Sequence, residues 1–414
     1  MNAQLKPLEA DVARPACLME ITRTGARMDA VMEGIMWARL RRMRTRLQEA
    51  LGNAEHGVIA RSIHAIYEAL PADRQARVLL SSEFCESYMA LDAARKQRPE
   101  AGSDAMAWDA ESARNLCAIH DLVQREKALL DLASGSTPRY LLESRDWVVD
   151  SPVGDQLARK DVQGRWTLET RPMLGDCVAV DLHSKVARHH EPRSGVLSQP
   201  CLALDEAEQA VVLDKLSRAL AGIDRAEPLY GLVIRNFVRR IVVRKSEEST
   251  PDVARRFGSE HVPRQPGSLR LLNIHHPELS VEACMESIMH ESTHNFLAAW
   301  ELANGFFVAN DYQHRVVSPW SGNPIPNSSY IHAVFVYYVC HRLLKSHLAV
   351  ADNIDAAARA HVHRRLAVCA AGFLIEQDLS SRLMSTQPLN ADIGRMMDDM
   401  QADMKREYGY GRQQ

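Results

Sequence analysis

The first third of the chain has apolar residues three and four positions apart, with arginine and glutamate between them. This spacing gives a helix one apolar and one polar face, so it predicts amphipathic helices from about Ala30 to Ala133. Breaks expected at Gly52-Asn53, near Pro71 and at Arg98–Ala105 divide the stretch into three or four helices. Ala133–Pro138 has the composition of a turn or linker, so residues 1–138 are predicted to form a helical N-terminal region.

Short runs rich in Val, Ile and Leu occur only after this region, and such runs predict strands. One helix is expected between them at Asp205–Ala221, because its acidic start suits the positive end of the helix dipole. Surface loops are expected at Val186–Pro200 and Lys245–Gly267, which contain proline and many charges. The predicted strands are Cys177–Leu182, Arg240–Arg244 and Ser268–Ile274.

The last third of the chain returns to helical spacing, and no internal repeat or low-complexity tract interrupts it. We therefore expect an α+β fold that is mostly helical, with a small sheet preceding the helix that carries the motif described below. Residues 139–414 are expected to form a metal-binding catalytic region. The predicted helices of this last third are Val281–Ala303, Tyr330–Leu348, Asp355–Leu379 and Ala391–Glu407.

Composition narrows the classes of partner. The chain has 50 Lys+Arg against 53 Asp+Glu, and this near-zero balance of interspersed charges argues against binding to nucleic acid or an anionic membrane. The longest apolar run, Leu366–Ile375, falls well short of the roughly 20 residues that cross a bilayer. The N-terminal sequence lacks the pattern of a secretory signal, so a cytoplasmic location is expected. The 8 cysteines form no CxxC pair and are expected to be free thiols.

The most informative segment is MESIMHESTHNFLAAWE, which contains the pattern HExxH as His290, Glu291 and His294. Residues four apart on a helix lie one turn above each other, which is the separation that two imidazoles need to bind one metal ion. Glu291 is rotated by one residue step, so its carboxylate is expected beside a metal-bound water, where a general base acts. An amphipathic helix with two surface histidines would show the same pattern. The preceding strand, short loop and apolar helix favour metal binding.

A catalytic metal site needs a third protein ligand and open positions for water or substrate. The extended pattern HExxHxxGxxH is excluded, because Leu297 and Trp300 stand where it requires Gly and His. His332 is the leading candidate for the third ligand, since a helix that begins near it could face the motif helix. Glu301, Asp311 and His314 are the alternatives. The groups His189-His190, His275-His276 and His361–His363 are interpreted as surface residues or as residues in the layer around the site, because neighbouring side chains point apart and chelate poorly.

Downstream of the motif, the segment VVSPWSGNPIPNSSYIHAVFVYYV contains an S-P-W element, a Pro-x-Pro and a helix start with small and aromatic residues. With the strand before the motif and ESIMHESTH itself, this segment resembles the HExxH-motif peptide-modification proteins of bacterial natural-product gene clusters. These are regarded as 2-oxoglutarate-dependent peptide β-hydroxylases. The resemblance covers about Asp205 to Leu348, about a third of the chain.

The resemblance implies that His290 and His294 bind Fe(II), with His332 as the third ligand. It also implies a pocket wall formed by Ser318, Pro319 and Trp320, and a 2-oxoglutarate co-substrate. The family usually reads W-R-x-x-P-R-P, whereas this chain has Ser321 and Ile325 in place of the two arginines. A buried carboxylate needs a cationic partner, so that role passes to one of the nearby basic residues. The candidates are Arg315, Arg342 and Lys345.

The sequence is compatible with three hypotheses for the function of this chain, two enzymatic and one non-catalytic. The first is an Fe(II), 2-oxoglutarate-dependent oxygenase that hydroxylates a peptide, or a peptide-like or carrier-bound small-molecule substrate, in natural-product biosynthesis. The second is a zinc hydrolase or peptidase in which Glu291 removes a proton from the metal-bound water. The motif alone favours the hydrolase, and the downstream resemblance reverses this order. The third is a metal-stabilised interaction protein, which a closed fourth ligand would favour.

Overall fold

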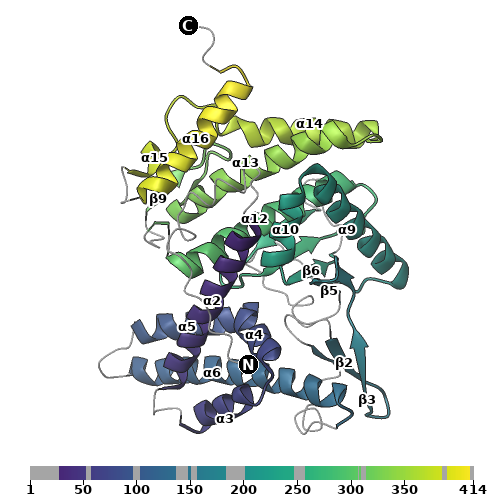
Figure 1. The fold of residues 1–414 in the computed structure, drawn as a ribbon, viewed down its shortest axis with the longest axis vertical. Helices are drawn as coiled ribbons and strands as arrows, with labels where there is room; N and C mark the ends of the chain where they lie inside the picture. The colour runs from purple at the N-terminus through teal and green to yellow at the C-terminus, as the bar shows by residue number, and fades with distance from the viewer. Residues whose placement is uncertain are drawn as a thin grey trace. The chain divides into compact units, whose positions relative to one another are not determined.

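A computed structural model describes residues 28–52, 57–96, 103–136, 148–150, 156–182, 201–246, 257–305, 307–308, 314–384 and 389–410. Helices make up most of these residues and the strands form small sheets (Figure 1), so the α+β prediction is confirmed. None of the helices in this described part of the chain is long and apolar enough to span a bilayer.

The chain forms two compact units, and each is built from separate stretches of sequence. One unit draws on Met1–Ala38, Asp214–Phe237 and His275–Gln414, and the other on Arg39–Leu213 and Val238–Ile274. The predicted division into residues 1–138 and 139–414 follows sequence order instead. It stays a prediction, since compact units need not match functional regions.

The unit that contains Arg39–Leu213 begins with helices. Three or four helices were predicted here, and the described residues of this part form five. The additional helix arises because a break at Ser81 separates α4 (Ala72–Leu80) from α5 (Ser82–Lys96). The Ser81 hydroxyl donates to the carbonyl of Val78 at 2.7 Å and accepts from the backbone N–H of Phe84 at 3.1 Å. One side chain thus ends a helix and caps the next. The five are α2 (Met28–Leu51, shared with the other unit), α3 (Gly57–Glu68), α4, α5 and α6 (Ser103–Ala133).

A three-stranded antiparallel sheet that the hydrophobic pattern did not predict packs on α6. Ala158 of its central strand is fully buried against Ala128 and Leu129 of the helix. Its last strand carries mostly exposed residues, so it lacks the apolar run by which strands were recognised. The strands are β1 (Val148–Asp150), β2 (Gln156–Lys160) and β3 (Trp166–Thr170).

A second sheet contains the three predicted strands. Its order is β4-β5-β6-β8-β7, with β5, β6 and β8 parallel and both edge strands antiparallel to their neighbours. Every residue of β5, β6 and β8 is buried, which explains why these strands read as apolar runs. β7 lies inside the stretch predicted as the loop Lys245–Gly267, and the predicted loop Val186–Pro200 lies outside the described residues. The strands are β4 (Met173–Leu174), β5 (Val178–Asp181), β6 (Arg240–Arg244), β7 (Gly258–His261) and β8 (Ser268–Leu272).

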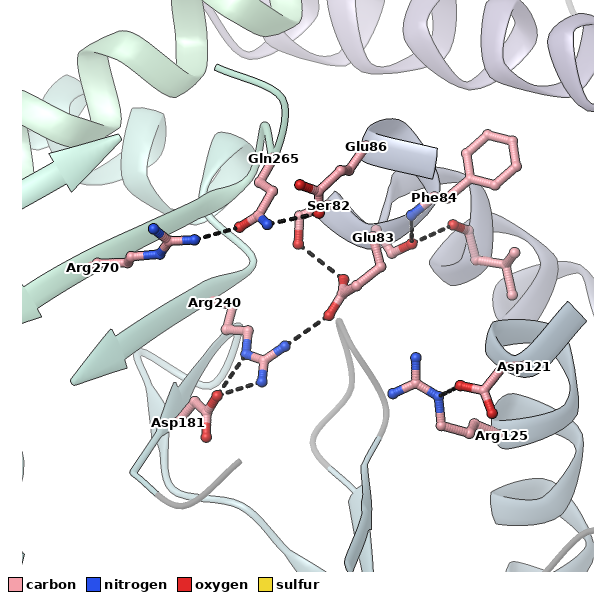
Figure 2. Close-up of polar contacts among 12 residues, drawn as sticks. Ser82, Glu83, Phe84, Glu86, Asp121, Arg125, Asp181, Arg240, Gln265 and Arg270 are labelled. Carbon is pink, nitrogen blue, oxygen red and sulfur yellow. Dashed lines mark hydrogen bonds and ion pairs between the residues drawn. The ribbon is translucent and has the colours of Figure 1, made fainter. Parts of the chain in front are cut away.

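Charged side chains connect this sheet to α5 (Figure 2). Arg240, whose side chain is 3% exposed, donates to Asp181 through Nε at 2.9 Å and to Glu83 of α5 through Nη1 at 2.9 Å. Gln265 donates to Glu86 at 2.8 Å and accepts from Arg270 at 3.2 Å. The buried charge of Arg240 is therefore paired with carboxylates of both the sheet and α5.

The other unit contains the motif helix, α12, which packs against α10, α13 and α14. Ser280 caps α12 by accepting from the N–H of Ala283 at 3.2 Å. The predicted helices of the last third are confirmed, except that α14 ends eight residues before Leu379. The elements are α9 (Glu206–Ala226, shared with the other unit), α10 (Pro228–Phe237), α12 (Val281–Asn304), β9 (Arg315–Val317), β10 (Pro324–Pro326), α13 (Asn327–Val350), α14 (Ala356–Ala371), α15 (Ser381–Met384) and α16 (Ala391–Glu407).

Candidate metal centre

His290, Glu291 and His294 lie near the middle of α12 and form a compact group of potential ligands. One ligand atom from each of the three lies within 4.8 Å of the others. The two imidazole rings are 5.2 Å apart between centroids, as the rise of one helical turn dictates. Glu291 is only 3% exposed, so its carboxylate is held inside the protein beside the two histidines.

The environment of His290 favours the neutral form that binds a metal. Burial lowers the pKa of this imidazole to about 4, with the carboxylate of Glu286 opposing the shift and the guanidinium of Arg365 adding to it. A pKa near 4 leaves the ring uncharged at neutral pH, and a metal ion needs the uncharged ring. Protons therefore compete weakly for this position.

His332 of α13 lies next to His294, although 38 residues separate them in the sequence. Their Nδ1 atoms are 3.1 Å apart, and their rings are inclined by 28°. Two nitrogens bound to one ion at about 2.0–2.1 Å and near the tetrahedral angle lie roughly 3.3 Å apart. The separation of the two Nδ1 atoms is that of a hydrogen bond between the rings, and it is also close to the spacing of two ligands of one ion. His332 is not a member of the compact group formed by His290, Glu291 and His294, so it lies beside this group through His294.

The alternative third ligands take other positions. Glu301 lies on the far side of His332, with its Oε2 3.3 Å from Nε2 of that ring. His314 precedes β9 and is exposed. Asp311 lies outside the described residues. Of the three candidates among the described residues, His332 is the one that lies beside His294.

Trp320 belongs to an aromatic stack that reaches His290. Its indole lies 4.6 Å from the ring of Tyr337, at an angle of 14°. Tyr337 in turn meets His290 edge to face at 6.1 Å. The indole N–H donates to the carbonyl of Cys369 at 3.0 Å, which fixes the ring against α14. Trp320 therefore forms part of the second layer around the histidines, with Tyr337 between them.

Ser318 positions this tryptophan instead of lining the site with its hydroxyl. Its Oγ accepts from the backbone N–H groups of Trp320 at 3.3 Å and Ser321 at 3.4 Å, in the turn between β9 and β10. Pro319 lies between Ser318 and Trp320 in the same turn. The three residues that the resemblance assigned to the pocket wall thus form one tight turn that presents the indole.

The basic residues expected to bind a co-substrate carboxylate are not gathered at the histidines. Arg342 lies ten residues after His332, which is about 15 Å along the helix, and it pairs with Glu407 at 2.7 Å and with Asp403. Lys345 also pairs with Glu407, at 2.8 Å. Arg315 is exposed and donates to the carbonyl of Pro324 at 3.2 Å, within the β9–β10 hairpin. These side chains stabilise other parts of the unit.

A pair that the sequence did not point to lies beside His290. Arg365 of α14 donates through Nε to both carboxylate oxygens of Glu286, at 2.8 and 2.9 Å. His361, predicted to lie on the surface or in the layer around the site, has its Nε2 3.9 Å from the same carboxylate. Glu286 precedes His290 by four residues, so helical spacing alone could have placed it on the same face. No local pattern connects Arg365 with α12, because α14 is distant in sequence.

Neither a comparison with models of known protein families nor a search of curated proteins found a match for this chain.

Proposed function

We propose that this chain is a metal-dependent enzyme whose ion is bound by His290, His294 and His332. The observation that supports this most directly is the 3.1 Å separation of the Nδ1 atoms of His294 and His332, which come from two different helices. Two packed helices hold a ligand geometry more rigidly than loops do. Three protein nitrogens leave further coordination positions for water, co-substrate or substrate.

Within this class we place first an Fe(II), 2-oxoglutarate-dependent oxygenase that hydroxylates a peptide or peptide-like substrate in natural-product biosynthesis. The support is the family resemblance of the segment Val316–Val339, together with the stacking of Trp320 on Tyr337 and the edge-to-face contact of Tyr337 with His290. Iron and 2-oxoglutarate would supply the oxidising chemistry when bound. The chain's part would be to hold the iron and to give the substrate an aromatic wall.

In this proposal the cation that binds the carboxylate of 2-oxoglutarate is Arg365, a residue that the sequence did not indicate. Arg365 donates to Glu286, which precedes His290 by one helical turn, so it is a better placed cation than Arg342. Glu286 already accepts from its guanidinium, so a co-substrate carboxylate would have to compete with Glu286 or share the arginine.

A zinc hydrolase is the second candidate, and Glu291 is the observation that favours it. This carboxylate is 3% exposed and lies within 4.8 Å of ligand atoms of both motif histidines. A base in this position can take the proton of a water whose pKa the zinc ion has lowered. Glu291 has no comparable task in the oxygenase, where the iron and the co-substrate carry the chemistry.

The decisive experiment starts from protein purified without oxygen and measures the metals it retains. The Fe(II)-loaded protein is then titrated with 2-oxoglutarate, and the charge-transfer absorption of the complex, oxygen consumption and succinate release are recorded. The oxygenase predicts binding of 2-oxoglutarate and formation of succinate in step with oxygen uptake. Tightly held zinc, no spectral change with 2-oxoglutarate and cleavage of a mixed peptide library would replace it with the hydrolase. Inertness in both assays would leave the metal-stabilised interaction protein.

A further inference from the structure

Glu301 makes two contacts that a solvent-facing helix residue would not make. It is 8% exposed, and its Oε2 lies 3.3 Å from Nε2 of His332. Its Oε1 accepts the backbone N–H of Phe307 at 3.1 Å. Both carboxylate oxygens are thus engaged, and the residue lies two turns beyond His294 on the same helix. The carboxylate is held in place from two sides.

The two ring nitrogens of His332 face different partners, one a carboxylate and the other a second imidazole. Nε2 faces the carboxylate of Glu301, whereas Nδ1 faces Nδ1 of His294 at 3.1 Å. A carboxylate only accepts hydrogen bonds, so the nitrogen that faces it carries the proton. In the neutral ring the lone pair then belongs to Nδ1, which is the atom directed at His294.

We propose that Glu301 is a positioning residue that fixes His332 in the Nε2-protonated tautomer and turns its Nδ1 lone pair toward the metal. This inference rests on the proposed function, because it assumes that His332 binds the ion. Histidines that bind metals usually donate their other ring N–H to a carboxylate or carbonyl, which orients the ring and increases its basicity. Glu301 therefore acts through His332 and not as a ligand of its own.

The aromatic neighbours of His332 add to this orientation. Phe307 meets the imidazole edge to face at 6.1 Å and stacks on Trp300 at 4.8 Å. Since the N–H of Phe307 is bonded to Glu301, the carboxylate anchors both the ring of His332 and a phenyl ring beside it. Removing the carboxylate would leave the imidazole free to rotate about its side-chain bonds while the helices stay packed.

The same two helices provide a matched control. Glu282 of α12 lies 3.6 Å from Nε2 of His347 of α13, so this pair has the same chemistry and joins the same elements as Glu301 and His332. His347 is not one of the three proposed metal ligands. Glu282→Gln therefore tests what the loss of a Glu–His contact between α12 and α13 does to the protein in general.

The experiment is a competition titration of Zn²⁺ and Co²⁺ against a chelating indicator, on the full chain and its variants. Glu301→Ala is expected to bind either ion 10–100-fold more weakly than the wild type. Glu301→Gln should lie in between, because its amide oxygen still accepts the Nε2 proton without the charge. Glu282→Gln should bind as the wild type does. The ¹⁵N signals of His332, assigned with His332→Ala, should show the Nε2-protonated tautomer in the wild type and a mixture in Glu301→Ala.

Each contrary outcome has a distinct meaning. If Glu301→Ala binds both ions like the wild type while His332→Ala does not, the positioning role is overturned and the proposed metal centre stands. If the wild type binds neither ion, the metal centre and the positioning role fall together. If Glu301→Ala loses its fold, Glu301→Gln decides. Weaker metal binding in Glu301→Gln than in Glu282→Gln then supports the role, and wild-type affinity in Glu301→Gln overturns it.

Discussion

At the scale of single residues, His332 is the side chain on which the candidate centre depends most. Replacing it by alanine removes one of three nitrogens, so the affinity for the ion should fall by more than the roughly 10–100-fold typical of an outer-layer change. The measurement is the metal content after gel filtration, followed by the indicator titration. His347→Ala, on the same helix and 5% exposed, is the matched control and should retain the metal. Normal retention in His332→Ala would remove it from the ligand set.

Glu291 separates the two chemistries. Glu291→Gln keeps the shape of the buried side chain and removes its basicity. In a zinc hydrolase the rate should fall by roughly 10²–10⁴-fold, because the general base is lost. In an iron oxygenase the rate of succinate formation should change little. The comparison is valid when both proteins carry the same amount of metal, so metal content is measured on the same samples.

Gly372 allows the close approach of Trp320. A Cβ at this position would lie 2.2 Å from Cε2 of the indole, so an alanine must push the ring away from its place beside Tyr337. Gly372→Ala should therefore destabilise the protein by about 1–3 kcal/mol and change the tryptophan fluorescence. Urea denaturation measures the first effect. Gly52→Ala, whose Cβ would have its nearest neighbour at 3.4 Å, is the control and should have a smaller effect.

At the scale of elements, the junction between α5 and the parallel strands depends on a buried arginine. Arg240→Met leaves Asp181, itself 3% exposed, without its cation. Breaking a buried pair from one side typically costs about 3–5 kcal/mol, so the urea midpoint should fall strongly. The double variant Arg240→Met with Asp181→Leu should cost less than the single one, because the partly exposed carboxylate of Glu83 is then the one that loses its contact with Arg240, and no deeply buried carboxylate does. A double variant as unstable as the sum of both single variants would contradict this.

The elements also show where sequence patterns are informative. The buried strands β5, β6 and β8 and the helices α12, α13 and α16 each contain a run long or regular enough to be recognised alone. No such run marks the exposed strand β3, the polar strand β7 or the short β9–β10 hairpin. These strands are stabilised by pairing with neighbouring strands and contribute little apolar surface of their own. α10 was missed because it follows α9 after a single residue and begins with a proline.

At the scale of the whole molecule, the stability should fall as the solution becomes acidic. Burial lowers the pKa of His341 to about 4, against a usual value near 6.5, while its neighbours Glu407, Arg342 and Lys345 shift it less. Between these two values the unfolded chain binds the proton and the folded chain does not. The free energy of unfolding should then decrease by up to about 1.4 kcal/mol per pH unit for such a histidine.

Urea denaturation at pH 7 and pH 5 measures this decrease. His341→Gln should show a flatter pH dependence than the wild type, since it removes one of the groups that take up a proton on unfolding. The lowered pKa values of Asp403 and Glu407 act in the same direction at lower pH, because both carboxylates stabilise the fold only while they are ionised. A stability that rises toward pH 5 would contradict the assignment.

The sequence by itself determined the features that depend on short separations along the chain. Helical geometry fixes the distance between residues four apart, so HExxH already implied the arrangement of His290 and His294 on one face of α12. Apolar periodicity likewise predicted the long helices, and short apolar runs predicted the strands β5, β6 and β8. These inferences need no knowledge of how the elements pack.

The tertiary structure alone decided the contacts between distant elements. It brought His332 beside His294, put Glu301 behind His332 and diverted Arg342 to Asp403 and Glu407. Such contacts follow from how helix faces interlock and where buried charges find partners, and both depend on the whole unit. A lone histidine or arginine in a sequence is compatible with many such partners, which is why local spacing could propose these residues but could not assign their roles.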